Sequence, residues 1–140
     1  MKHLDKRSGE WKEFYNDARA YHKTAIGSLK RPNLFTPELI QNIAAMGIEK
    51  YFMAIFMQKN TLPRNHTMRD LLEESGSFLE LPDKLKTTLL YMDSLQSLCS
   101  LDNFKITKPS REDAALFIEA IDKVAQLAER ELACAQNNNI

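Results

Sequence analysis

The amino-acid sequence predicts an all-α fold: an antiparallel up-and-down bundle of four long helices with one short extra helix. Each long segment repeats its apolar residues at steps of three and four, which is the period of one helix face. Prolines and capping residues stand at the segment boundaries, and no segment has the pattern of a strand. The links are short, so we expect successive helices to pack as antiparallel neighbours.

The first two helices have clear boundary signals. The first is expected from about Gly9 to Lys30, because Pro32 cannot continue a helix. Its apolar face comprises Trp11, Phe14, Tyr15, Ala18, Tyr21, Ala25 and Leu29. The second begins where Thr36 can cap the helix and Pro37 fits the first helical position.

The second helix, which is expected to reach about Lys59, is apolar nearly all round. Its polar residues lie in one arc, which contains Glu38, Gln41, Asn42, Glu49 and Lys50. Phe52, Met53 and Phe56 fall inside the same arc, so this side also needs a cover. The cover is either the short helix of the same chain or another subunit, and the three residues are a candidate dimer interface.

The remaining three helices also have capping residues or apolar stripes. A short helix is expected from Thr67 to Gly76, where Thr67 and Asp70 have the spacing of a capping box. The fourth helix begins after Pro82 and carries the stripe Leu85, Leu89, Met92, Leu95 and Cys99. The last helix begins at Ser110 and buries Phe117, Ile121, Val124, Ala128 and Leu132.

Composition limits the class of protein. The 140 residues, 44% of them apolar, suit a single domain over 1–136 with a frayed tail at 137–140. The 19 basic and 19 acidic residues cancel, which argues against a protein that coats nucleic acid. We expect no signal peptide, and Glu49 and Lys50 in the most apolar helix argue against a membrane span. A cytoplasmic location follows, with Cys99 and Cys134 as reduced thiols.

Few residues carry recognisable chemistry. His3, His22 and His66 are far apart and lack ligand partners at useful spacing, so we expect neither a metal nor another cofactor. The exception is a basic group near the second and third helices: Lys50, Lys59, Arg64, His66 and Arg69. Cations beside aromatic residues can receive a phosphate or a nucleotide. The alternative is an ordinary hydrophilic loop.

Two stretches of the sequence, Asn42 to Ala54 and Pro63 to Leu72, together resemble the HEPN domain, a helical family. The first runs from Asn42 to Ala54, NIAAMGIEKYFMA, where the family often has an alanine-rich start and then a Glu-Lys pair. The second runs from Pro63 to Leu72, PRNHTMRDLL, where the family has a proline followed by His-x-Leu-x-x-Leu-Leu. The resemblance implies the family's helical layout for most of the chain.

Two departures from the family matter. Met53 replaces a frequent lysine. Family members that cleave RNA carry an arginine, four to six residues and then a histidine near the last helices. This sequence lacks such a pair, because Arg64 and His66 are too close and no histidine follows. The resemblance therefore implies a member without the ribonuclease residues.

The leading hypothesis is a non-catalytic binding or interaction module of the HEPN type. The resemblance implies a nucleotide or RNA ligand or a minimal nucleotidyltransferase as partner, and assembly as a homodimer. Two alternatives stay open: a divergent ribonuclease that uses other residues, and a purely structural partner built as a helical bundle.

Overall fold

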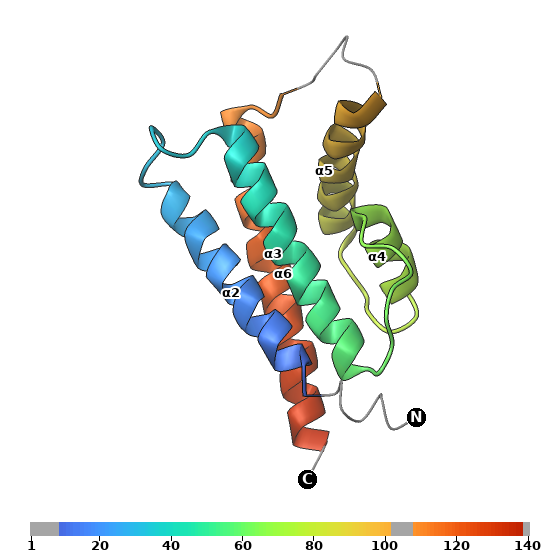
Figure 1. Cartoon of the computed structure of the whole chain (residues 1–140). Helices are drawn as coiled ribbons and strands as arrows, with labels where there is room; N and C mark the ends of the chain where they lie inside the picture. Colours follow the sequence, from blue (N-terminus) through green and yellow to red (C-terminus); the bar gives the residue numbers. More distant parts are fainter. Residues whose placement is uncertain (1–8, 102–107, 139–140) are drawn as a thin grey trace.

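Within residues 9–101 and 108–138, which the computed structural model describes, the chain forms five helices and no strand (Figure 1). They are α2 (Trp11–Ser28), α3 (Pro37–Gln58), α4 (Met68–Ser75), α5 (Asp83–Leu101) and α6 (Arg111–Asn138). The four long helices run alternately up and down, and the short α4 packs beside α5. The predicted fold class is confirmed.

Helix α3 lies at the centre of the bundle and contacts α2, α6 and α4. Thr36 caps its start as predicted, since its hydroxyl accepts a hydrogen bond from the Leu39 amide over 3.2 Å. At its end, Asn60 takes the left-handed conformation with φ of 58°. The Thr61 amide then donates back to the Phe56 carbonyl over 3.0 Å, which closes the last turn.

The side of α3 that carries Phe52, Met53 and Phe56 is covered by the same chain. These side chains are 1%, 6% and 2% exposed. Helix α4 contacts α3, and the Phe78 ring meets the Phe56 ring edge-on, with centroids 5.2 Å apart. The candidate dimer interface at these three residues is therefore corrected: they belong to the core of one chain, and a second subunit is not needed to cover them.

The turn between α2 and α3 is held from α6. The guanidinium of Arg111, the first residue of α6, donates hydrogen bonds to the carbonyls of Pro32 and Phe35 over 2.9 and 2.7 Å. These are charge-assisted bonds to backbone groups that have no helical partner. Arg111 thus links the beginning of the last helix to the connection between the first two.

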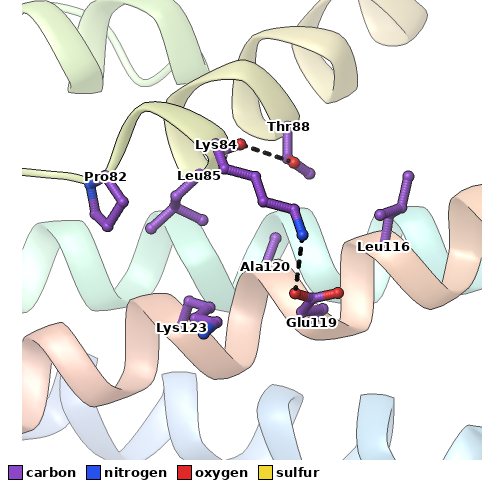
Figure 2. A pocket seen from close by; sticks show the side chains of 8 residues that line it. All are labelled: Pro82, Lys84, Leu85, Thr88, Leu116, Glu119, Ala120 and Lys123. Carbon is purple, nitrogen blue, oxygen red and sulfur yellow. Dashed lines mark hydrogen bonds and ion pairs between the residues drawn. The ribbon is translucent and has the colours of Figure 1, made fainter.

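Helix α5 contacts α6 through polar pairs as well as apolar side chains. The Tyr91 hydroxyl donates to the Asp113 carboxylate over 3.1 Å. The Lys84 ammonium lies 3.8 Å from the Glu119 carboxylate (Figure 2). Asp113 also accepts a hydrogen bond from the Ser110 amide, and its own amide donates to the Ser110 hydroxyl, both over 3.0 Å. This reciprocal cap is the start that the sequence predicts for the last helix.

Most of the predicted apolar stripes are buried. On α5 and α6 these are Leu85, Leu89, Met92, Leu95, Phe117, Ile121, Val124, Ala128 and Leu132. The side chains of Cys99 and Cys134 lie outside what the structure describes. None of the described helices combines the length and the apolarity that a bilayer crossing requires.

Two helix ends differ from the predicted ones. Helix α2 ends at Ser28 instead of Lys30, so Leu29 lies beyond it and is 58% exposed rather than part of the buried face. Helix α6 continues through Asn138, so the backbone stays helical into the tail that the sequence marks at 137–140. Residues 139–140 lie outside the described residues.

Candidate functional site

The structure does not bring the predicted basic group together. The Lys50 ammonium lies 5.3 Å from the centre of the Phe14 ring, on the α2 side of α3. The Lys59 ammonium lies 5.6 Å from the centre of the Phe78 ring, on the side where α4 and α5 pack. The two cations therefore lie on different sides of α3, and they do not face a common ligand.

The other members of the group contact acidic residues or solvent. The backbone amide of Arg64 donates to the Glu74 carboxylate at 3.0 and 3.1 Å, and its Nε lies 3.8 Å from it. Nδ1 of His66 lies 3.0 Å from Oε2 of Glu49, which ties the link before α4 to α3. Arg69 is exposed. These contacts favour the alternative interpretation of this stretch, a hydrophilic loop whose charges hold it to neighbouring helices.

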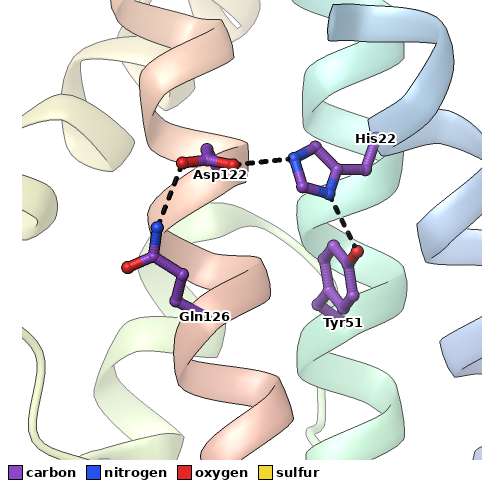
Figure 3. Close-up of polar contacts among 4 residues, drawn as sticks. All are labelled: His22, Tyr51, Asp122 and Gln126. Carbon is purple, nitrogen blue, oxygen red and sulfur yellow. Dashed lines mark hydrogen bonds and ion pairs between the residues drawn. The ribbon is translucent and has the colours of Figure 1, made fainter.

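A different polar cluster lies where α2, α3 and α6 meet (Figure 3). Nε2 of His22 is 3.2 Å from Oδ1 of Asp122, and Nδ1 of His22 is 3.2 Å from the Tyr51 hydroxyl. The Gln126 amide donates to the second oxygen of Asp122 over 3.1 Å. His22 comes from α2, Tyr51 from α3 and the last two residues from α6, so this network joins three helices.

The chemistry of the groups fixes the direction of these hydrogen bonds. An ionised carboxylate only accepts, so Nε2 of His22 carries the hydrogen that faces Asp122. In a neutral imidazole, Nδ1 then holds the lone pair, and the Tyr51 hydroxyl donates to it. Both ring nitrogens of His22 are therefore engaged within the protein.

The arrangement has the order acid, histidine, hydroxyl, which also occurs in nucleophilic catalysis. The Tyr51 side chain is buried, and burial raises the pKa of its hydroxyl from 10.0 to about 12, with smaller contributions from Tyr15 and Glu129. An activated nucleophile needs the opposite shift, toward the ionised form. Burial thus keeps Tyr51 protonated, and the hydrogen bonds of the network position three helices rather than generate a phenolate.

An open hollow lies beside the network, between α2 and α6. Along α2 it is lined by Asn16, Arg19, Ala20, His22, Lys23 and Ile26, and it is completed by Tyr51 and Glu129. Arg19 and Lys23 are exposed. Among the described residues, no carboxylate lies within ion-pair distance of either cation. The hollow therefore presents two unpaired positive charges, with one carboxylate on the opposite wall.

The hollow continues toward the beginning of α2. There Trp11, Lys12 and Tyr15 face Leu132 and Ala133 of α6, and Asn16 and Glu129 belong to both parts. The Trp11 and Tyr15 rings meet edge-on with centroids 6.3 Å apart, and the Arg19 guanidinium lies 5.9 Å from the centre of the Tyr15 ring. We call this surface, from Trp11 to Ile26 on α2, the α2/α6 groove.

Sequence reasoning missed this groove for a definite reason. The sequence shows no partner for His22 at a short spacing. Its partners in the structure, Tyr51 and Asp122, are 29 and 100 residues away along the chain. The available signal was local: Arg19 and Lys23 flank His22 on one helix. That signal does not show which helix lies opposite.

Among the described residues, no three side chains that could ligate a metal come together. Comparisons with protein-family models, with curated proteins and with solved structures found no match. The HEPN resemblance rests on the residues quoted above.

Proposed function

We propose that this chain is a non-catalytic binding module of the HEPN type, with a nucleotide as its ligand and the α2/α6 groove as its site. The observation that carries the site is the pair Arg19 and Lys23, which stand one helical turn apart on the wall of the groove without acidic partners. Two such cations suit the oxygens of a phosphate group.

The rest of the groove suits the other end of a nucleotide. Trp11 and Tyr15 are half-buried aromatic side chains next to the cations, and a base can stack on such rings. The Asn16 amide and the Glu129 carboxylate lie between the two parts and can pair with polar groups on the edge of a base. A neutral overall charge is compatible with this ligand, because one nucleotide needs only a local positive surplus.

The contacts of His22 support the non-catalytic assignment that the resemblance implies. A general base for RNA cleavage needs a lone pair within hydrogen-bond reach of the RNA hydroxyl whose proton it removes. Both nitrogens of His22 are engaged, by Asp122 and Tyr51, and Tyr51 remains protonated. We expect no cleavage when pure protein is incubated with RNA in a chelator. Cleavage that His22→Ala abolishes would instead support the divergent ribonuclease.

Binding is tested by calorimetric titration with ATP in a chelator. Arg19→Gln and Lys23→Gln are each expected to weaken binding by about 1.5–3 kcal/mol, the value of a hydrogen bond to a charged group. Lys30→Gln is the matched control, since Lys30 is exposed but lies outside the groove. Equal losses in all three variants would point to non-specific charge attraction, and no loss at Arg19 and Lys23 would remove the groove as the site.

The proposed assembly is a homodimer through a different face of α3 from the one corrected above. Leu39 and Met46 are 41% and 44% exposed, and Ile43 lies half-buried between them. These three share one face of the helix. Two-fold pairing of such a face with its own copy covers both at once. A nucleotidyltransferase partner, which the resemblance implies, is the other candidate for this face.

A further inference from the structure

A pocket lies between α5 and α6 (Figure 2), and none of the residues that line it belongs to the α2/α6 groove. Its apolar walls are Pro82, Leu85, Leu116 and Ala120, and Thr88, Lys84, Glu119 and Lys123 complete its rim. The pocket exists because Ala120 presents only a methyl group to the space between the two helices. Leu85 and Ala120 are buried at its base, while Leu116 is 38% exposed at its mouth.

The pocket has the size of one small ring. Its volume is about 140 Å³. An apolar protein cavity of about 150 Å³ accepts benzene. A ring or a branched chain of similar volume therefore fits against Leu85 and Ala120.

The rim favours an anion. The Lys84 ammonium reaches across the mouth to Glu119 at 3.8 Å, with side chains that are 80% and 50% exposed. Such an exposed pair is weak, so a ligand can replace Glu119 at little cost. In the described part of the chain, no acid lies within ion-pair distance of Lys123. Two cations and one carboxylate thus leave one positive charge unpaired.

We propose that this pocket binds a carboxylate joined to a ring-sized apolar body. The body lies against Leu85, Leu116 and Ala120, and the carboxylate pairs with Lys123 and Lys84. A free small acid and the C-terminal residue of a peptide share this chemistry. The site is independent of the nucleotide proposal, because none of its residues lines the α2/α6 groove.

The test is a titration of the ¹⁵N-labelled protein, followed by amide chemical shifts, with phenylacetate and with its neutral analogue phenylacetamide. We expect saturable shifts around Leu85, Leu116 and Ala120, with a Kd of roughly 1 mM for so small a ligand. Phenylacetamide is expected to bind about two- to fivefold more weakly than phenylacetate, because it lacks the one exposed ion pair. Equal binding of the acid and the amide would overturn the assigned ligand class.

Variants locate the site. Ala120→Met fills the pocket from α6, and Thr88→Leu fills it from the rim of α5 without changing a buried position, so at least one filled variant keeps the fold. Both are expected to abolish the shifts, and Lys123→Gln is expected to narrow the difference between the acid and the amide, because only Lys84 then remains to pair with the carboxylate. Lys86→Gln is the matched control, since Lys86 is exposed on α5 outside the pocket. Unchanged binding in folded Ala120→Met and Thr88→Leu would refute the proposal.

The peptide Gly-Gly-Phe distinguishes the two sources of the ligand. Tighter binding than phenylacetate, lost in Thr88→Leu, indicates the C-terminal residue of a peptide. Weaker binding, also lost in Thr88→Leu, indicates a free acid. Arg19→Gln is expected to leave both titrations unchanged, so a failure here is distinct from a failure of the nucleotide proposal.

Discussion

At the scale of single residues, the partners of a side chain decide its role. His22 and His66 are both partly exposed histidines, the first within α2 and the second just before α4. His22 has both ring nitrogens engaged by residues of two other helices. His66 makes one contact, with Glu49, and Thr67 rather than His66 caps α4. His22 therefore links three helices of the bundle, whereas His66 only links the loop before α4 to α3.

Tyr51→Phe is expected to alter stability in a way that depends on pH. At pH 8 the variant should be less stable by about 1 kcal/mol, because His22 loses a hydrogen bond. The pKa of Tyr51 is raised to about 12 in the folded protein, so the unfolded chain loses this proton first, near pH 10. The wild type therefore loses stability as pH rises from 10 to 12, and the variant lacks this loss.

The measurement is urea unfolding of both proteins from pH 8 to 11. The difference in unfolding free energy should shift by about 1.4 kcal/mol in favour of the variant by pH 11. Other groups that titrate at alkaline pH are common to both proteins and cancel in the difference. A difference that stays constant over this range would show that the hydroxyl is not held protonated by the fold.

His66→Ala is expected to cost only about 0.2–1 kcal/mol of stability, since its contact with Glu49 is between partly exposed side chains. Glu49→Gln should cost a similar amount, and the double variant little more, because both changes remove one interaction. ATP affinity should stay the same, since neither residue lines the α2/α6 groove. Thermal melts measure the stabilities, and a calorimetric titration measures the ATP affinity. Weaker ATP binding by His66→Ala would indicate that the nucleotide binds at the basic group near α3 and α4 and not in the α2/α6 groove.

At the scale of helices, close contact between α3 and its neighbours depends on Gly47. A Cβ at this position would overlap Cδ1 of Ile121 in α6 and would lie 3.0 Å from Cβ of Tyr21 in α2. Real Cβ atoms do not tolerate the first contact, so a larger residue requires either the buried Ile121 side chain to shift or the helices to move apart. The glycine is thus explained by packing, although glycine by itself weakens a helix.

Gly47→Ala is expected to lower the unfolding free energy by about 1–3 kcal/mol, because overpacking exceeds the gain of about 1 kcal/mol in helix propensity. Ile121→Val removes the Cδ1 atom that collides, so it should restore part of the loss in the Gly47→Ala background. Alone, Ile121→Val should cost about 0.5–1.5 kcal/mol. A double-mutant cycle by denaturant unfolding measures the coupling, and additive losses would contradict the steric explanation.

At the scale of the whole molecule, α3 is buried on two sides within one chain and keeps one apolar face exposed. The core takes Phe52, Met53 and Phe56, whereas Leu39 and Met46 remain outside it. We predict a homodimer at high micromolar concentration, and Leu39→Glu with Met46→Glu should make it monomeric while helix content is unchanged. Sedimentation and circular dichroism measure both. A wild-type monomer under these conditions would contradict the prediction, and Leu116→Glu serves as a control on another face.

The helices themselves follow from the sequence because their causes are local. Caps such as Thr36 and Ser110 act within three residues, and prolines act on the adjacent turn. Apolar periodicity then predicts which positions are buried, as on α5 and α6. The sequence by itself therefore determined the all-α class, the number and order of the helices within the described residues, and their buried stripes.

Only the tertiary structure decided which faces meet. In the folded chain, Phe78 packs against Phe56, and Lys50 and Lys59 lie on different sides of α3. His22 contacts two residues that are 29 and 100 positions away along the chain. Helix periodicity gives the direction of a side chain around its own axis, but not the neighbour that lies in that direction. That neighbour depends on how all the helices pack together, and the sequence of one helix does not specify which other helix packs against it.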